Sequence, residues 1–197
     1  MNKSWDIGYL YDEVFEKEGD SYKSLLWGGQ NRQFVTYRTI CQEIDFNGTS
    51  ILDVGCGFGD FYEFLYERTG WLKRYVGIDI KKEFVDIARK RYCTGPELMF
   101  ACCDIDSMPK VKVDYALAIG TLATKDIFDD LIPKMWKIAD LGIVFTCLSD
   151  IDYKGSLVSY HPDRILATCF VLSPHVVMRH DYGEQEATFF VFRKERR

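Results

Sequence analysis

The stretch ILDVGCGFGD, from Ile51 to Asp60, places three glycines at alternate positions directly after a short apolar run and between two aspartates. Glycine reaches left-handed backbone conformations and lets a ligand approach the main chain closely. A glycine loop that leaves the first strand of a doubly wound sheet places a ligand at a helix N-terminus, beyond the carboxyl ends of the strands. The stretch therefore predicts a ligand cleft at that edge of an α/β sheet.

Similar apolar runs recur along the chain, with helix-like stretches between them. They are SILDV, RYVGIDI, LMFACCD, VDYALAI and LGIVFTC. Strands that alternate with helices in this way are typical of βαβ units and a parallel sheet. Near the end, HVVMRHDY and ATFFVFRK are joined by the turn-like GEQE, which predicts a hairpin. Its second member is apolar at nearly every position and should be buried on both faces, whereas the mixed first member suits an edge strand.

The chain of 197 residues contains no repeat, low-complexity tract or flexible linker. We therefore expect a single domain over residues 1–197, which is a usual size for one hydrophobic core. Phe34, Tyr37, Cys41 and Ile44 form a stripe at helical spacing. Residues 1–45 are thus predicted to be a helical preface that could cap the site, with the core over residues 48–194.

Composition narrows the cellular setting and the partners. A formal net charge of -5 does not support a broad basic surface for nucleic acid. Seven cysteines, an odd number without a CxxC pair, favour a reduced, cytoplasmic chain. The N-terminus lacks the apolar core of a signal peptide, and no run approaches the roughly 18 apolar residues of a membrane span. We expect a soluble protein without a membrane partner; its oligomeric state is open.

The ligand of the glycine loop is predicted from charge. The dinucleotide fingerprint is GxGxxG, whereas Gly55, Gly57 and Gly59 form GxGxG, and Asp60 adds a negative charge where a dinucleotide would bring two phosphates. Like charges at that range repel by roughly 1–4 kcal/mol per close pair. An adenosyl ligand that has no phosphate and carries positive charge near the loop fits better.

LDVGCGFGD followed by YVGIDI resembles the first two motifs of the class I S-adenosylmethionine-dependent methyltransferases. The resemblance covers about residues 48–194 and implies a Rossmann-like, doubly wound, mostly parallel sheet of seven strands. Its implied strand order is 3-2-1-4-5-7-6, with an antiparallel C-terminal hairpin. The implied cofactor is S-adenosyl-L-methionine, with S-adenosyl-L-homocysteine as product. LWGGQNRQF and the segment from YHPDR onward further resemble small bacterial and phage-type methyltransferases whose substrate we cannot name.

The same resemblance implies which residues hold the cofactor. Asp53 and the glycine backbone would hold the methionyl end, and Asp79 the ribose hydroxyls. Asp104 would meet the adenine amino group with Ile105 beside the ring, and Gly120 would lie under the sulfonium. The complete set is Asp53, Gly55, Cys56, Gly57, Gly59, Asp79, Ile80, Asp104, Ile105, Ile119 and Gly120.

The acceptor is narrowed by motifs that the sequence lacks. AIGTLAT stands where amino-methylating DNA enzymes have an Asn/Asp-Pro-Pro-aromatic motif, no proline precedes a cysteine, and Gly120 stands where RNA ribose methylation places an aspartate. We therefore expect a small-molecule acceptor. Methylation of tRNA or of a protein side chain is the alternative, and GTLATKD leaves open a non-catalytic S-adenosylmethionine-binding subunit or sensor.

Two further groups of residues are candidates on the acceptor side. Trp27, Gln30 and Arg32 combine a flat apolar wall with polar anchors beside two glycines, as a small acceptor requires. A general base is needed only where the acceptor must lose a proton. The candidates for that base are Tyr160, His161, His180 and Asp181. No metal is expected, because Asp150 and Asp152 lack the further acid that Gly120 replaces.

Overall fold

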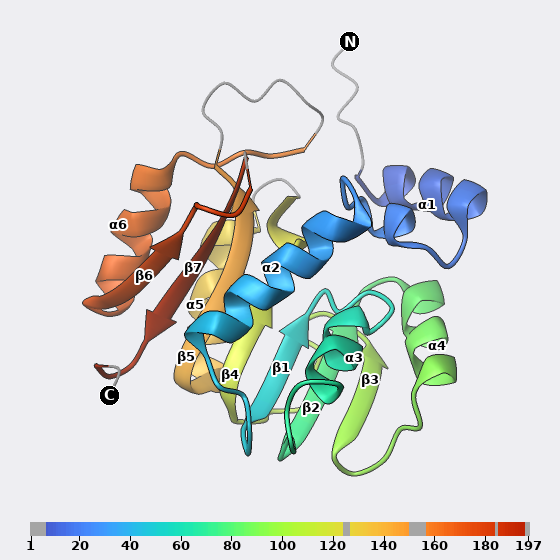
Figure 1. Ribbon diagram of the computed structural model, residues 1–197, viewed down its shortest axis with the longest axis horizontal. Coiled ribbons are helices and arrows are strands. Elements are labelled where there is room, and N and C mark those ends of the chain that lie inside the picture. The colour runs from blue at the N-terminus through green and yellow to red at the C-terminus, as the bar shows by residue number, and fades with distance from the viewer. Residues whose placement is uncertain (1–6, 124–126, 150–156, 184, 196–197) are drawn as a thin grey trace.

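The computed structural model describes residues 7–123, 127–149, 157–183 and 185–195, and these contain one sheet of seven strands (Figure 1). The strands are β1 (Ser50–Val54), β2 (Arg74–Asp79), β3 (Leu98–Cys102), β4 (Val113–Ala118), β5 (Ala139–Leu148), β6 (His175–Arg179) and β7 (Glu186–Phe192). Their order is β3-β2-β1-β4-β5-β7-β6, and only the pairs that include β7 are antiparallel. The predicted Rossmann-like fold and strand order are confirmed.

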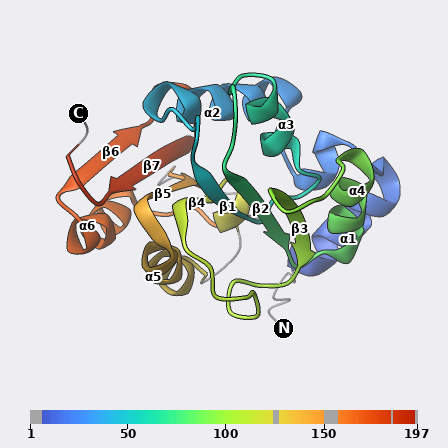
Figure 2. The same ribbon diagram turned by 90° about the horizontal axis from the view of Figure 1, so that it is seen from below.

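Helices cover both faces of the sheet (Figure 2). They are α1 (Ile7–Glu18), α2 (Gln30–Glu43), α3 (Asp60–Tyr66), α4 (Lys82–Arg91), α5 (Phe128–Ile138) and α6 (Pro162–Leu172), with short 3₁₀ helices η1 (Tyr22–Leu25) and η2 (Thr121–Ala123). Buried side chains of α2, α3 and α4 share one core cluster, and those of α5 and α6 share the other. Within the described ranges, no helix has the length and apolar character needed to cross a membrane.

The hairpin formed by β6 and β7 has the predicted burial. All seven residues of β7 are buried, because the strand pairs with β5 on one side and β6 on the other. Phe189 stacks on Phe145 of β5, with ring centroids 5.4 Å apart. The half-buried β6 forms one edge of the sheet. The prediction of an edge strand followed by an inner strand is confirmed.

The buried face of α2 differs from the predicted stripe. Tyr37 and Ile44 of that stripe are buried, but Phe34 is 45% exposed and Cys41 is half-buried, while the polar Gln33 and Thr36 take buried positions. The Thr36 hydroxyl donates a hydrogen bond to Glu186 (3.2 Å). Because this face of the helix packs against the carboxylate of Glu186, polar residues can be buried there. The buried side of α2 is therefore rotated away from the stripe that apolar spacing alone predicts.

Candidate active site

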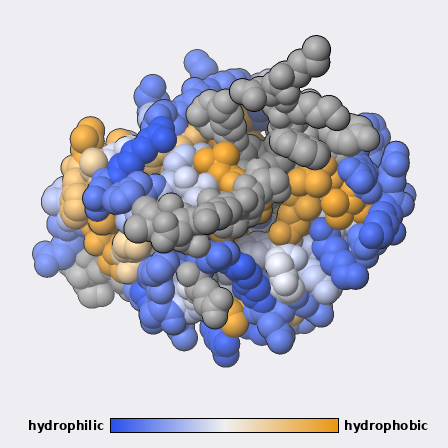
Figure 3. Space-filling view, turned by 90° about the horizontal axis from the view of Figure 1, so that it is seen from above, coloured by the Kyte–Doolittle hydropathy of each residue, from blue (hydrophilic) through white to orange (hydrophobic). Residues whose placement is uncertain are grey.

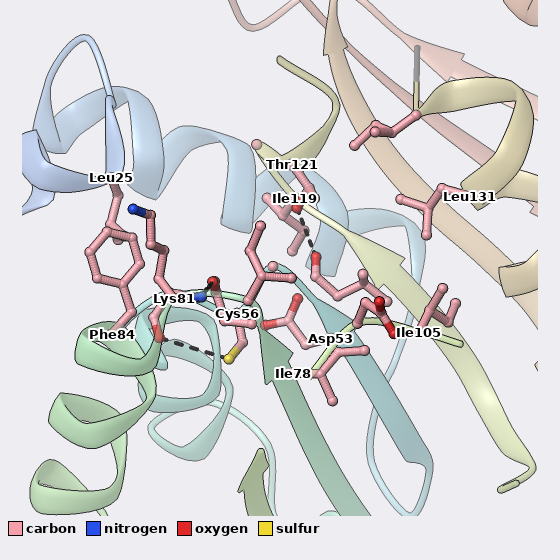
Figure 4. A pocket seen from close by; sticks show the side chains of 18 of the residues that line it. Leu25, Asp53, Cys56, Ile78, Lys81, Phe84, Ile105, Ile119, Thr121 and Leu131 are labelled. Atoms are coloured by element: carbon pink, nitrogen blue, oxygen red, sulfur yellow. Dashed lines mark hydrogen bonds between the residues drawn. The ribbon is translucent and has the colours of Figure 1, made fainter. Parts of the chain in front are cut away.

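A cavity of about 440 Å³ lies at the carboxyl ends of the central strands (Figure 4). Its volume is typical of small-molecule and cofactor pockets, which span roughly 300–1,000 Å³. Hydrophobic atoms are interspersed with hydrophilic ones on the side of the molecule where these strand ends meet (Figure 3). Ten of the residues expected at the cofactor line the cavity: Asp53, Gly55, Cys56, Gly57, Asp79, Ile80, Asp104, Ile105, Ile119 and Gly120.

The glycine loop turns tightly against the end of β2. The N–H groups of Gly55 and Cys56 both donate to the carbonyl of Ile78, at 2.8 and 3.0 Å. Gly55 has a φ of 75°, and a Cβ atom there would lie 2.4 Å from Oγ1 of Thr121. That hydroxyl itself donates to the carbonyl of Val54 (2.7 Å), as Figure 4 shows. Only glycine fits this position, which leaves the main chain bare toward the cavity.

Gly59 is the one predicted cofactor residue that does not line the cavity. It precedes α3 with a φ of 81°, and a Cβ atom there would lie 2.8 Å from the Tyr92 ring and 3.0 Å from that of Phe100. The absence of a side chain lets the end of the loop pack against these rings. Gly59 therefore packs against the rings of Tyr92 and Phe100 and does not face the cavity.

Asp79 joins the end of β2 to the glycine loop. Its Oδ2 accepts a hydrogen bond from the N–H of Gly57, and its Oδ1 accepts one from the N–H of Lys81, both at 2.9 Å. Burial raises the pKa of Asp79, and these backbone hydrogen bonds act in the opposite direction. The carboxylate is thus fixed in position at the wall of the cavity.

Asp53 lies deeper, inside β1. The residue is only 2% exposed, and its Oδ2 accepts a hydrogen bond from the hydroxyl of Tyr75 at 2.5 Å. Burial raises the pKa of Asp53 to about 7, although the hydrogen bond from Tyr75 lowers it. A positively charged group in the cavity would favour the ionised form of this carboxyl group.

The end of the cavity near β3 and α5 combines apolar side chains with carboxylates. Figure 4 shows Ile105 and Leu131 at this end, and Asp104 lies beside them. Oδ1 of Asp104 accepts a hydrogen bond from the N–H of Ser107 (2.7 Å), and hydrogen bonds from Ser107 lower the pKa of Asp104. An apolar slot with an ionised acceptor at its rim suits a flat ring that carries an amino group.

The segment before β1 forms the roof of the cavity. The residues that line it are Tyr11 of α1, Leu25 of η1, Trp27 between η1 and α2, and Tyr37 of α2. Burial, and then the charge of Asp79, raise the pKa of Tyr11 to about 12.

Sequence reasoning did not identify Tyr11, Tyr37, Lys81 or Phe84 as parts of this wall, whereas it did predict the loop around Thr121 at the site. The spacing of aromatic residues in α1 could have indicated Tyr11. Tyr11 and Phe15 stand four residues apart, on one face of α1, and both rings lie edge-on to Phe84.

The three residues expected to contact the acceptor are separated in the structure. Trp27 lines the cavity, where it covers Gly120. Gln30 lines a neighbouring hollow between α2 and α3. The Nε atom of Arg32 lies 3.5 Å from Oε2 of Glu186. Its Nη2 atom is buried and has no hydrogen-bond partner among the described residues.

The four candidates for a general base do not line the cavity. Tyr160 is buried in the core, its ring 5.3 Å from that of Phe128, and Nδ1 of His161 accepts a hydrogen bond at the start of α6. His180 is exposed after β6, and Asp181 pairs with Arg179. Asp150 and Asp152 lie outside the described residues.

Comparisons with known proteins agree with this architecture. Residues 51–139 match the family model described as methyltransferase domain. No match is found among the curated proteins. Magnesium protoporphyrin IX methyltransferase from Synechocystis PCC 6803, crystallised with S-adenosylhomocysteine, has a TM-score of 0.69 at 15% identity, over 96% of this chain and 100% of that one. An N-methyltransferase from Bradyrhizobium japonicum has a TM-score of 0.60 at 15% identity, over 86% and 100%.

At this level of identity, the structural likenesses show the fold, and the family model covers the segment from β1 to the start of β5. That segment contains the glycine loop, Asp79 and Asp104, which all meet at the cavity. Residues 51–139 are therefore similar to a methyltransferase domain, and the chain has the fold of S-adenosylmethionine-dependent methyltransferases of known structure.

Proposed function

We propose that the protein transfers the methyl group of S-adenosylmethionine to a small-molecule acceptor. The observation that carries this proposal is the cavity lined by Asp53, Asp79 and Asp104, which come from the neighbouring strands β1 and β2 and from the segment after β3. These carboxylates suit the ammonium group, the ribose hydroxyls and the adenine amino group of one extended ligand. The backbone turn is GxGxG, and Asp60 follows it at the position where a dinucleotide would bring two phosphates.

The described residues support catalysis by placement. S-adenosylmethionine supplies a methyl group already activated on a sulfonium, so much of the rate enhancement can come from holding the two reactants in line at near-attack distance. Gly120 and Ile119 form the floor at the end of β4, and Trp27 covers Gly120 from the roof.

A small acceptor fits the roofed site better than a macromolecule does. Tyr11, Leu25, Trp27 and Tyr37 enclose the cavity, so a large substrate would have to displace the segment before β1. Arg32 remains our candidate for an acceptor anchor, since its Nη2 group is buried without a partner in the described part of the chain. A buried donor of this kind gains from an oxygen atom of a bound molecule.

The proposal is tested by incubating the protein with cell extract and S-adenosylmethionine that is labelled on the methyl group. The reaction is then separated into small-molecule and macromolecular fractions. We expect the label in the small-molecule fraction, and much less transfer by the Asp79→Ala variant when the donor is subsaturating. Label retained on RNA or protein would support the macromolecular alternative. Donor binding without any transfer would support the sensor.

A further inference from the structure

A buried polar cluster lies between α2 and the strands β5 and β7, next to the floor of the cavity. Its centre is Glu186, the first residue of β7, which is only 5% exposed. The Thr36 hydroxyl shares its one hydrogen between the carbonyl of Arg32 (3.0 Å) and Oε2 of Glu186 (3.2 Å), and Nε of Arg32 lies 3.5 Å from the same carboxylate oxygen. A buried carboxylate is costly to desolvate, so such a group is kept where it organises its neighbours.

Thr146 connects this carboxylate to the cavity. The Thr146 side chain is fully buried in β5, and its Oγ1 accepts a hydrogen bond from the N–H of Gly120 at 2.8 Å. Burial raises the pKa of Glu186, whereas Arg32 and hydrogen bonds from Thr146 and Thr36 lower it. A hydroxyl group has one hydrogen. Thr146 and Glu186 are diagonal neighbours on one face of the paired strands β5 and β7, so the hydroxyl can give its hydrogen to the carboxylate while an oxygen lone pair accepts from Gly120.

Gly120 needs such support. Its φ is 74°, and a Cβ atom there would lie 3.3 Å from the Trp27 ring, so the turn is both left-handed and in close contact with the roof. Trp27 shortly precedes α2, the helix that carries Arg32 and Thr36. The floor beneath the methyl group and the roof above it are therefore both tied to the same carboxylate.

We propose that Glu186 is a positioning residue for methyl transfer. Through Thr146 it holds the Gly120 turn in place. Through Thr36 and Arg32 it holds α2, and with it Trp27 of the roof, at a fixed distance from that turn. This inference rests on the proposed function, because it assumes that the methyl group lies over Gly120. Glu186 does not line the cavity, so it acts through its partners. Its negative charge also favours the sulfonium of the donor over the neutral thioether of the product.

The test compares the affinities of the donor and of the product, which differ by the methyl group and its charge. Calorimetry gives the dissociation constants of S-adenosylmethionine and S-adenosylhomocysteine for the wild type and for Glu186→Gln, Thr146→Val and Thr146→Ser. We expect Glu186→Gln and Thr146→Val to weaken donor binding about fivefold more than product binding, equivalent to about 1 kcal/mol for one hydrogen bond. Thr146→Ser keeps the hydroxyl and should keep the wild-type ratio.

Ser173→Ala is the matched control for a merely structural effect. The buried Ser173 hydroxyl donates a hydrogen bond to the carbonyl of Phe192 (2.6 Å), at the end of β7 opposite Glu186. The variant should lose stability in chemical denaturation without a change in the affinity ratio. Equal weakening of donor and product in Glu186→Gln and Thr146→Val, or the same change of ratio in Ser173→Ala, would overturn the inference. A wild-type protein that binds neither ligand would overturn the proposed function and this inference with it.

Discussion

Asp79 uses both oxygens of its carboxylate to accept backbone hydrogen bonds, and it still faces the cavity. We expect Asp79→Ala to weaken S-adenosylmethionine binding by about 1.5–3 kcal/mol, the usual range for lost hydrogen bonds to a charged group. Calorimetry measures the change. Asp86→Ala is the control, since Asp86 lies on the exposed side of α4 in a surface pair with Lys82. An unchanged dissociation constant in folded Asp79→Ala would remove Asp79 from the site.

Asp53 makes donor binding depend on pH. With a pKa of about 7, it is mostly protonated at pH 6 and half ionised at pH 7. An ammonium group requires the ionised form, and α-amino groups with a pKa of about 7.7–8.0 stay mostly protonated in this range. Donor affinity should therefore rise about fivefold from pH 6 to pH 7, by the change in the ionised fraction. Asp53→Asn should flatten this rise, and an equally steep profile in that variant would contradict the assignment.

The candidate site illustrates which residues a sequence can indicate. Asp53, Asp79 and Asp104 stand in or directly after apolar runs, and the carboxyl ends of parallel strands meet at one edge of the sheet, so their convergence could be predicted. Tyr11 reaches the cavity only through the packing of α1 on α4. Glu186 becomes central only when β7 pairs with β5, a contact between distant parts of the chain. Local patterns do not contain such information.

Among the elements, the glycine loop tolerates the least change. In Gly55→Ala the new methyl group would meet Thr121 in a backbone conformation that favours glycine. We expect a loss of stability of about 1–3 kcal/mol from strain and overpacking, together with at least about tenfold weaker donor binding. Gly95→Ala is the matched control, because no heavy atom lies within 4 Å of its added Cβ. Chemical denaturation measures the stability of both variants, and calorimetry measures their affinity for the donor. Wild-type donor affinity in Gly55→Ala would refute the role of the loop.

The helices also show where periodicity is a sufficient guide. Apolar residues at helical spacing in α3 and α4 are buried, with Phe61, Phe64 and Leu65 inside on α3 and Phe84 and Ala88 inside on α4. Both of these faces pack mainly on aromatic and aliphatic side chains. The buried face of α2 includes Thr36, and a pattern of apolar residues cannot indicate a surface whose partner is a carboxylate.

At the scale of the whole molecule, a bound ligand should join the roof to the sheet. Tyr11 and the ion pair between Asp12 and Lys81 hold α1 over the cavity, and Lys17 near the end of α1 is 81% exposed. If α1 must lift for cleavage and the lifted form does not bind ligand, S-adenosylhomocysteine at about 100 Kd should slow trypsin cleavage after Lys17 up to about 100-fold.

Lys112, before β4, provides the internal control for that experiment. It lies at the opposite end of the strands, is 61% exposed, and should be cleaved at the same rate with and without the ligand. Mass spectrometry distinguishes the two cleavage products. Equal rates at Lys17 in both conditions would show that α1 does not close over the ligand.

The number of strands and the antiparallel hairpin could be predicted from the sequence because alternation and the hairpin each left a clear pattern. Five apolar runs separated by helical stretches predict parallel strands, and GEQE between two strand-like runs predicts the antiparallel pair. The position of β7 between β5 and β6 came from the resemblance, since periodicity does not specify which strand lies next to which. The contacts that decide this order, such as Phe145 on Phe189, join residues far apart in the chain.

The insertion of β7 between β5 and β6 has a consequence for synthesis on the ribosome. When β5 emerges, its partner on one side does not yet exist, because α6 and β6 are translated before β7. The backbone edge of β5, in a strand that contains Ile143, Val144 and Phe145, stays open for that interval. Such an edge can pair with another nascent chain. Expression at a lower temperature or with a chaperone that covers apolar segments should therefore increase the yield of folded protein, whereas a chain that stops after β6 should aggregate.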